Sequence, residues 1–213
     1  MILTEVAASV MERLKEGTWD LHTRAERHEL QQRMARGELR RDEYVSWLGQ
    51  MFLVHRALEK RLRAHRGHHT LRALRDEQFQ EPYLREDLAH FGIAPETVAP
   101  LPATARLLER IECSSEDPAA LLGYHYVLEG SHNGNRFVAA ALRRKLGLEA
   151  GHGDRYLDPY GEAQRELWGT FKREVDASGA TEEECERMVA SARDLFAAIY
   201  ELSGDLTSVP AST

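Results

Sequence analysis

Apolar residues recur along much of the chain at spacings of three and four, the period of an α-helix that buries one face. The stretch from about Arg41 to Arg66 shows this pattern most clearly. Strand-like alternation bounded by turn residues does not occur, so the sequence predicts an all-α protein. The apolar stripe of this stretch consists of Tyr44, Trp47, Leu48, Met51, His55, Leu58 and Leu62.

The same pattern predicts about seven helices around one core, with prolines between them. Asp117 and Pro118 open one long helix and Gly147 closes it, because aspartate caps helix starts and glycine adopts the left-handed turn that ends a helix. We expect one domain over residues 1–205 and a disordered tail over 206–213. The expected helices span about Thr4–His28, Arg41–Arg66, Leu71–His90, Ala103–Glu112, Ala119–Leu146, Glu162–Ala177 and Glu182–Leu202.

Composition narrows the function classes. The chain has 213 residues, of which 42% are hydrophobic and 30% charged, and its formal net charge is −7. This charge disfavours binding to nucleic acid or to an anionic membrane, and no apolar run is long enough to span a bilayer. The first residues predict an amphipathic helix and not a signal peptide. Two cysteines without metal-type spacing, Cys113 and Cys185, favour a reducing cytoplasm.

The first helix carries a candidate metal ligand. His22 lies at the edge of its core face, and Glu26 follows one turn later on the same side. An imidazole that ligates a metal needs an acceptor on its other ring nitrogen, and Glu26 can serve. The alternative is an ordinary surface pair.

Two glycines mark the long helix that begins near Ala119. Gly130 and Gly134 are four residues apart and therefore share a face. Each costs about 0.5–1 kcal/mol relative to alanine within a helix. The pair favours either a kinked helix against which a flat macrocycle lies, or close packing with another helix; the segment alone leaves both open.

Two segments of the sequence together resemble haem oxygenases. LKEGTWDLHTRAER is similar to the proximal-helix signature of that family. YVLEGSHNG resembles the distal helix of the bacterial, phytochrome-associated branch, and the two motifs lie in the family's order. The resemblance, which extends over most of the chain, implies a single-domain helical bundle with haem between a proximal helix and a kinked distal helix.

The resemblance also assigns roles. It implies that His22 is the axial iron ligand, that Glu26 orients it, and that Gly130 and Gly134 line the distal side of haem. The family's propionate-contacting tyrosine falls near His125, between two tyrosines that remain alternatives. The other implied haem-binding residues are Lys15, Lys172 and Arg173, with Tyr124 and Tyr126 as those two tyrosines.

The distal segment departs from the family pattern at three positions. Ser131 stands where animal members have a catalytic aspartate, so protons must reach the site by another residue or a water chain. Asn135 replaces the second glycine of the usual pair. His132 could act on bound dioxygen or ligate iron, but its helical position favours solvent or another helix, because it lies about 100–200° from the glycine face.

The resemblance implies an enzyme that cleaves haem, with O2, to biliverdin, carbon monoxide and ferrous iron. The sequence carries no flavin or nicotinamide motif, so electrons must come from a ferredoxin or an NAD(P)H-dependent reductase. The resembled branch also suggests a bilin-accepting phytochrome. A basic run could dock the electron donor, or could be an ordinary solvated surface: Arg56, Lys60, Arg61, Arg63, Arg66, Arg72 and Arg75.

Two other functions fit parts of the sequence. The departures in the distal segment would suit a non-catalytic haem-binding sensor. A non-haem di-iron oxidase would use Glu129 and His132 as one half-site, but a complete site needs a second such pair on a helix. Glu149 and His152, the other pair at this spacing, lie in a glycine-rich stretch.

Overall fold

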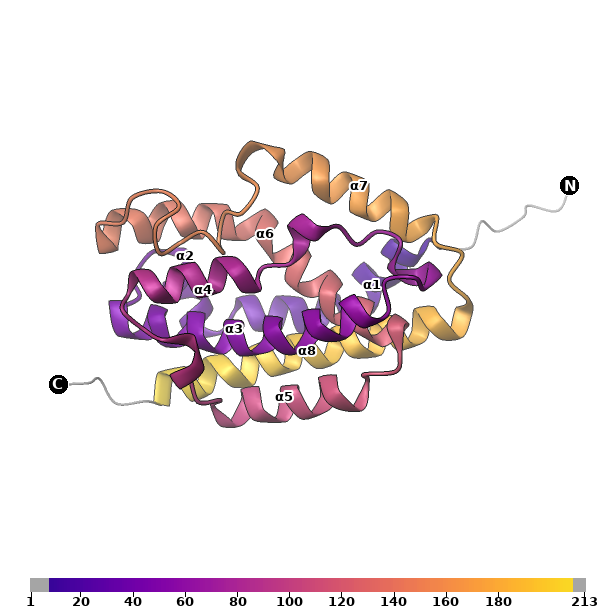
Figure 1. The fold of residues 1–213 in the computed structure, drawn as a ribbon, viewed down its shortest axis with the longest axis horizontal. Coiled ribbons are helices and arrows are strands. Elements are labelled where there is room, and N and C mark those ends of the chain that lie inside the picture. The colour runs from indigo at the N-terminus through magenta and orange to yellow at the C-terminus, as the bar shows by residue number, and fades with distance from the viewer. Residues whose placement is uncertain (1–7, 209–213) are drawn as a thin grey trace, which may run out of the picture.

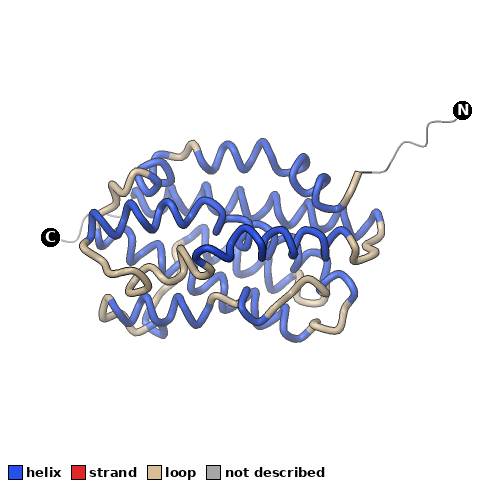
Figure 2. Tube along the Cα trace, turned by 90° about the horizontal axis from the view of Figure 1, so that it is seen from above, coloured by secondary structure: helices blue, strands red, loops and turns tan. Residues whose placement is uncertain are grey.

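A computed structural model describes residues 8–208, and these fold into eight α-helices joined by loops and four short 3₁₀ turns (Figure 1). No strand occurs in this range, which confirms the all-α prediction. The helices run roughly along the long axis of the molecule (Figure 2). Their bounds are α1 Val10–Glu26, α2 Glu29–Ala35, α3 Arg41–Ala64, α4 Glu81–His90, α5 Pro102–Cys113, α6 Pro118–Leu146, α7 Gln164–Asp176 and α8 Glu182–Ser208, with turns η1 His69–Leu71, η2 Asp76–Gln78, η3 Pro95–Thr97 and η4 Gly161–Ala163.

Local sequence determines where the two helices most important for function begin. α1 starts at a capping box, in which Ser9 Oγ accepts the Glu12 N–H at 3.2 Å and the Glu12 carboxylate accepts the Ser9 N–H at 2.8 Å. Asp117 caps α6 by accepting the N–H groups of the second and third helical residues at 3.1 and 3.2 Å. Gly147 ends α6 with φ +68°, as predicted.

Some predicted boundaries were wrong. The segment expected to form one helix from Leu71 to His90 instead forms two 3₁₀ turns, and α4 begins only at Glu81, with a proline in its first turn. The short helix α2 was not predicted. The last helix continues to Ser208, so the first residues of the expected tail are helical, and 209–213 lie outside the described residues, as does the predicted start of the first helix at Thr4.

α8 is the common support for α1 and α6, and it meets each of them at a glycine. A Cβ atom on Gly17 of α1 would lie 2.6 Å from Cγ1 of Val189. A Cβ atom on Gly123 of α6 would lie 2.1 Å from the carbonyl oxygen of Met188. Both separations are too short for any larger residue, so α1 and α6 are held against adjacent residues of α8.

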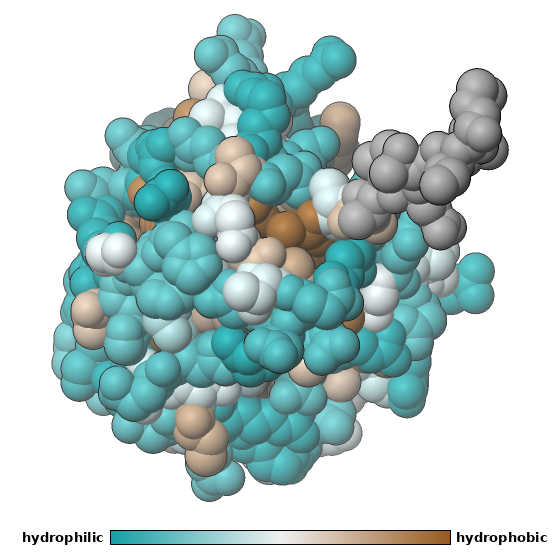
Figure 3. Space-filling view, turned by 90° about the vertical axis from the view of Figure 1, so that its right-hand side faces the viewer, coloured by the Kyte–Doolittle hydropathy of each residue, from teal (hydrophilic) through white to brown (hydrophobic). Residues whose placement is uncertain are grey.

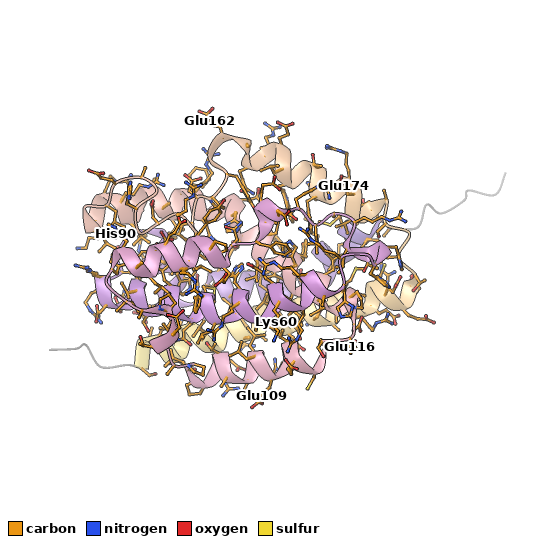
Figure 4. The ribbon with its side chains drawn as sticks, in the orientation of Figure 1. Lys60, His90, Glu109, Glu116, Glu162 and Glu174 are labelled. Atoms are coloured by element: carbon orange, nitrogen blue, oxygen red, sulfur yellow. The ribbon has the colours of Figure 1, made fainter. Side chains whose placement is uncertain are left out.

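Charged side chains such as Glu109 and Glu162 project from the outer faces of the bundle (Figure 4). Apolar residues reach the surface in a hollow at the end of the bundle where the described part of α1 begins (Figure 3). A cavity of about 720 Å³ lies between α3, α4 and the following loop, lined by residues such as Val45, Phe91 and Val98. Within 8–208, no helix has the length and apolar character needed to cross a membrane.

Candidate functional site

His22 has one ring nitrogen paired and the other without a partner. Its Nε2 lies 3.4 Å from a Glu26 carboxylate oxygen. Its Nδ1 is buried and has no hydrogen-bond partner among the described residues. The ring stacks on Trp19, with centroids 5.6 Å apart, and meets the edge of Phe196 at 5.2 Å. Buried polar atoms are nearly always satisfied, so an unpaired imidazole nitrogen suits a group that accepts an external ligand.

The two glycines predicted from the sequence occupy different surroundings on α6. A Cβ atom at Gly134 would meet nothing within 4 Å, so no other helix packs there. A Cβ atom at Gly130 would lie 3.3 Å from the Trp168 ring of α7. Close helix packing therefore does not explain Gly134. The glycine of α6 that allows close packing is Gly123, which was not predicted from the sequence. The ribbon of α6 changes direction about halfway along (Figure 1).

Aromatic residues surround these positions. Trp168 stacks on Phe171, with centroids 5.4 Å apart, and lies 5.9 Å from the ring of Tyr126. The two large hydrophobic residues most exposed in the described chain are Trp19, at 59%, and Phe137, at 70%. Trp19 is three residues before His22 and Phe137 three residues after Gly134, so each lies about one turn from the site.

We use the name apolar cleft for the group of residues His22, Trp19, Gly130, Gly134 and Trp168, in which Trp19 stacks on His22 and Trp168 lies against Gly130. Its residues come from α1, α6 and α7, and α7 packs on both of the other helices. An apolar, aromatic lining with a single unpaired imidazole nitrogen suits a flat macrocycle with a central metal. These residues thus fit haem.

The predicted propionate contacts are cationic and exposed. Lys15 lies two turns before His22 on the same side of α1. The Lys172 Nζ lies 5.9 Å from the centre of the Trp168 ring. Arg173, also exposed, donates a hydrogen bond to Thr170 at 2.9 Å. All three side chains are exposed, so they can contact an anionic group at the surface of the protein.

The structure separates the three residues that the sequence left as alternatives on α6. Tyr124 is 2% exposed, and burial raises the pKa of its hydroxyl, while nearby Ser114 lowers it. His125 is buried with its ring 5.8 Å from that of Phe171. Tyr126 is half-buried, its ring lies 5.9 Å from that of Trp168, and burial raises the pKa of its hydroxyl while nearby Thr18 of α1 lowers it. Only Tyr126 of the three borders the cleft, so the assignment of Tyr124 to haem binding is not supported.

His132 lies on the opposite side of α6 from the glycines. It is 1% exposed and meets the rings of Tyr156 and Tyr160 edge-on, at centroid distances of 5.4 and 5.6 Å. Neither ring nitrogen has a partner among the described residues. Burial lowers the pKa of His132 to about 3, so the ring is neutral. The sequence predicted that His132 faces solvent or another helix. The ring is instead buried against two residues of the loop that follows α6, on the side of α6 away from Gly130 and Gly134.

Ser131 also contributes no free group in this structure. Its Oγ donates to the Leu128 carbonyl at 2.6 Å and accepts from Asn135 Nδ2 at 3.1 Å. The departures from the family pattern at 131 and 135 are thus coupled to each other. The hydroxyl is occupied by the helix itself.

Sequence reasoning missed a buried polar cluster behind α6. His55 of α3 lies 3.0 Å from both Glu59 and the hydroxyl of Tyr156. Tyr160 donates to Glu129 at 2.9 Å, and burial raises the pKa of that carboxyl to about 7. The helical spacing of His55 with Glu59, and of His125, Glu129 and His132, is the signal that could have found it.

This cluster does not form the predicted di-iron half-site. Glu129 and His132 are both buried in it, but no three ligand atoms around them lie close enough to hold a metal ion in the described part of the chain. Glu149 and His152, the second candidate pair, lie in a loop and not on a helix. No observation on the described residues favours a di-iron oxidase.

The predicted basic run is largely paired. Arg61 pairs with Glu112 and Arg66 with Asp76. Arg75 lies 2.5 Å from Glu174 of α7, a side chain labelled in Figure 4. These pairs reduce the positive charge that the run presents to a partner.

The fold and the aromatic surroundings of His22 define an all-helical protein of the kind that binds haem. Comparison with known proteins supports this and makes it specific: the model of the haem oxygenase family matches residues 8–204. The chain belongs to the haem oxygenase family. It is an oxidoreductase that converts haem to biliverdin.

Solved structures share this fold. The chain is similar to heme oxygenase-2 from Synechocystis, solved with haem and NO, with a TM-score of 0.87 and 22% identity over 93% of this chain and 85% of that one. Heme oxygenase from Leptospira interrogans gives a TM-score of 0.84 and 24% identity, over 95% and 100% of the two chains. The Neisseria meningitidis enzyme gives 0.72 and 20%, over 97% and 96%. No curated protein matches the chain.

Proposed function

We propose that this haem oxygenase binds haem in the apolar cleft, with His22 as the axial ligand of the iron and Glu26 as the group that orients it. The observation that carries the proposal is the imidazole with one nitrogen beside Glu26 and the other buried without a partner. A neutral imidazole held in this way is an iron ligand in many haem proteins.

Bound haem would supply both the iron centre at which O2 is activated and the ring carbon that is oxidised. The chain supplies position and exclusion of water. Gly134 leaves α6 bare, so a ring can approach the helix backbone there without displacing a side chain. The Trp168 ring lies against Gly130 and therefore limits how far the haem ring can extend along α6. Together they restrict which edge of the macrocycle faces α6.

We assign Lys15, Lys172 and Arg173 to the haem propionates, with Tyr126 near the same edge. Lysine and arginine at an open rim bind carboxylates while keeping their charge in water. Tyr126 lies near Thr18 of α1, so its hydroxyl is on the side of α6 that faces α1.

The partners that this function requires follow from the chemistry. Haem cleavage consumes electrons, and the sequence contains no flavin or nicotinamide motif, so the donor is a ferredoxin or an NAD(P)H-dependent reductase. The bilin product could pass to a phytochrome. Both free cysteines agree with the proposed cytoplasmic location. Reversing the charges of the exposed Lys60 and Arg72 tests whether the basic run binds the electron donor. If the donor docks there, the donor-driven rate of haem cleavage should fall at low salt. An unchanged rate would show that the basic run is not the docking surface.

Titration with haemin tests the axial ligand. The wild-type chain should give a saturating Soret absorbance with one haem per chain, and aerobic ascorbate should turn the complex green. His22→Ala should lose the Soret spectrum of the histidine-ligated complex and lose turnover, and added imidazole should restore part of both. His90→Ala, at an exposed histidine on the outer end of α4 (Figure 4), serves as the matched control.

Two results would contradict the proposal. An unaltered spectrum and rate in His22→Ala would remove His22 as ligand. A wild-type complex that binds haem but stays red with ascorbate would indicate a haem-binding protein without oxygenase activity under these conditions.

A further inference from the structure

Two histidines and a glutamate meet at the end of the bundle where α8 begins. His68 and His69 lie at the turn η1, just after α3, and Glu184 lies in the first turn of α8. One ligand atom from each of the three side chains lies within 4.8 Å of the other two. Glu184 is 115 positions from His69 in the chain, so the fold itself brings the carboxylate to the two histidines.

Each side chain is held in place by a second contact. His69 Nε2 lies 3.1 Å from Glu184 Oε2, and the same oxygen accepts the Thr181 N–H at 2.8 Å. His68 Nδ1 lies 2.9 Å from Thr70 Oγ1. His68 Nδ1 also accepts the Thr70 backbone N–H at 3.4 Å, as the N-cap of η1. These contacts hold the orientation of the His68 ring.

Glu184 is suited to be an anionic ligand. Its side chain is 11% exposed, and its Oε2 faces both the Thr181 N–H and the His69 ring. Two further glutamates in the same turn, Glu182 and Glu183, add negative charge near it.

We propose that His68, His69 and Glu184 form a binding site for a divalent first-row transition metal ion. Two imidazoles and one carboxylate suit Zn²⁺, Co²⁺ or Fe²⁺ and not Mg²⁺ or Ca²⁺, which prefer oxygen ligands only. Metal–ligand bonds of about 2.1 Å span ligand pairs up to ~4.2 Å apart, so small side-chain rotations complete the site. Water would fill the remaining positions, because His69 is partly exposed.

The metal site is separate from the apolar cleft. Glu184 precedes Phe196, the α8 residue that contacts His22, by twelve positions, which is about 18 Å along a helix. Metal bound at this end would join the segment after α3 to the start of α8. Because ions that bind only the folded state stabilise it, we expect a higher melting temperature with metal.

Titration of the haem-free protein with Co²⁺ tests the proposal, because Co²⁺ with nitrogen and oxygen ligands absorbs visible light. The wild-type chain should bind one Co²⁺, and Zn²⁺ should displace it and raise Tm. Glu184→Gln keeps an oxygen for the Thr181 N–H but removes the charge, and it should weaken Co²⁺ binding by about tenfold or more, as should His69→Gln. His90→Gln is the matched control and should bind as wild type does.

The same titration on His22→Ala distinguishes the two sites. Retained Co²⁺ absorbance in that variant supports the proposal. Loss of the signal in His22→Ala, or equal affinity of Glu184→Gln and wild type, would overturn it. Melting of each variant without metal shows whether the fold is intact, and a variant that melts early is replaced by His68→Gln.

Discussion

Replacing His132 by leucine is expected to stabilise the haem-free protein, although the substitution falls in the core. The side chain is 1% exposed and neither ring nitrogen has a partner among the described residues. A buried polar group left unpaired costs about 1–3 kcal/mol, whereas leucine has a similar volume and no polar atom. Imperfect packing against Tyr156 and Tyr160 offsets part of this gain. The expected net change in the free energy of unfolding is about +1–2 kcal/mol at pH 7.

The gain should increase at lower pH. Burial lowers the pKa of His132 to about 3, while the unfolded chain has the ordinary value near 6.5. Below pH 6.5 the unfolded state therefore binds a proton that the folded state does not, so the wild type loses stability as the pH falls. At pH 5 this loss is about 2 kcal/mol, and leucine removes it. The variant should then exceed wild type by about 3–4 kcal/mol.

Urea unfolding followed by circular dichroism, at pH 7 and pH 5, measures both quantities. His90→Leu, at an exposed histidine, is the control and should show no pH-dependent gain. A His132→Leu variant that is less stable than wild type at both values would show that the ring nitrogens have partners. The Soret spectrum of its haem complex should match wild type; a changed spectrum would place His132 at the iron.

The other predictions concern α6. Gly134→Ala should stabilise the haem-free protein by about 0.5–1 kcal/mol in urea unfolding, because alanine favours helix and meets nothing there. Gly123→Ala should destabilise it by about 3 kcal/mol or more, because its Cβ would overlap the Met188 carbonyl; a small effect would show that α8 can move away. Burial raises the pKa of Glu129 from 4.5 to about 7, so the folded state binds this proton more tightly than the unfolded state does. The resulting contribution to stability is fully present below pH 4.5 and is lost as the pH rises through 7. Glu129→Gln should therefore be more stable than wild type at pH 8, by about 3 kcal/mol, and identical pH profiles would contradict this.

The local parts of the fold could be read from the sequence. Caps such as Asp117 and Gly147 act through neighbouring residues, so the bounds of α6 were predicted closely. The segment 71–80 was not, because its apolar residues fit a helix while tertiary contacts hold it in turns: Glu59 of α3 accepts the backbone N–H groups of Gln80 and Glu81 at 2.6 and 3.0 Å.

The candidate site divides in the same way. The pairing of His22 with Glu26 is one helical turn and could be predicted, as could the shared face of Gly130 and Gly134. The contact of Trp168 with Gly130, and the meeting of His69 with Glu184, join residues far apart in the chain. Helical periodicity gives the direction of a side chain on its own helix but not the neighbour that it meets.

The glycine contacts of α8 bear on how the enzyme admits its substrate. Gly17 and Gly123 bring α1 and α6 into close contact with adjacent residues of α8, Val189 and Met188. We therefore expect the spacing of α1 and α6 at these contacts to stay the same when haem binds. α7 has no such contact with α8 among the glycine contacts of the described chain, so we expect entry of a rigid ring to displace α7 instead.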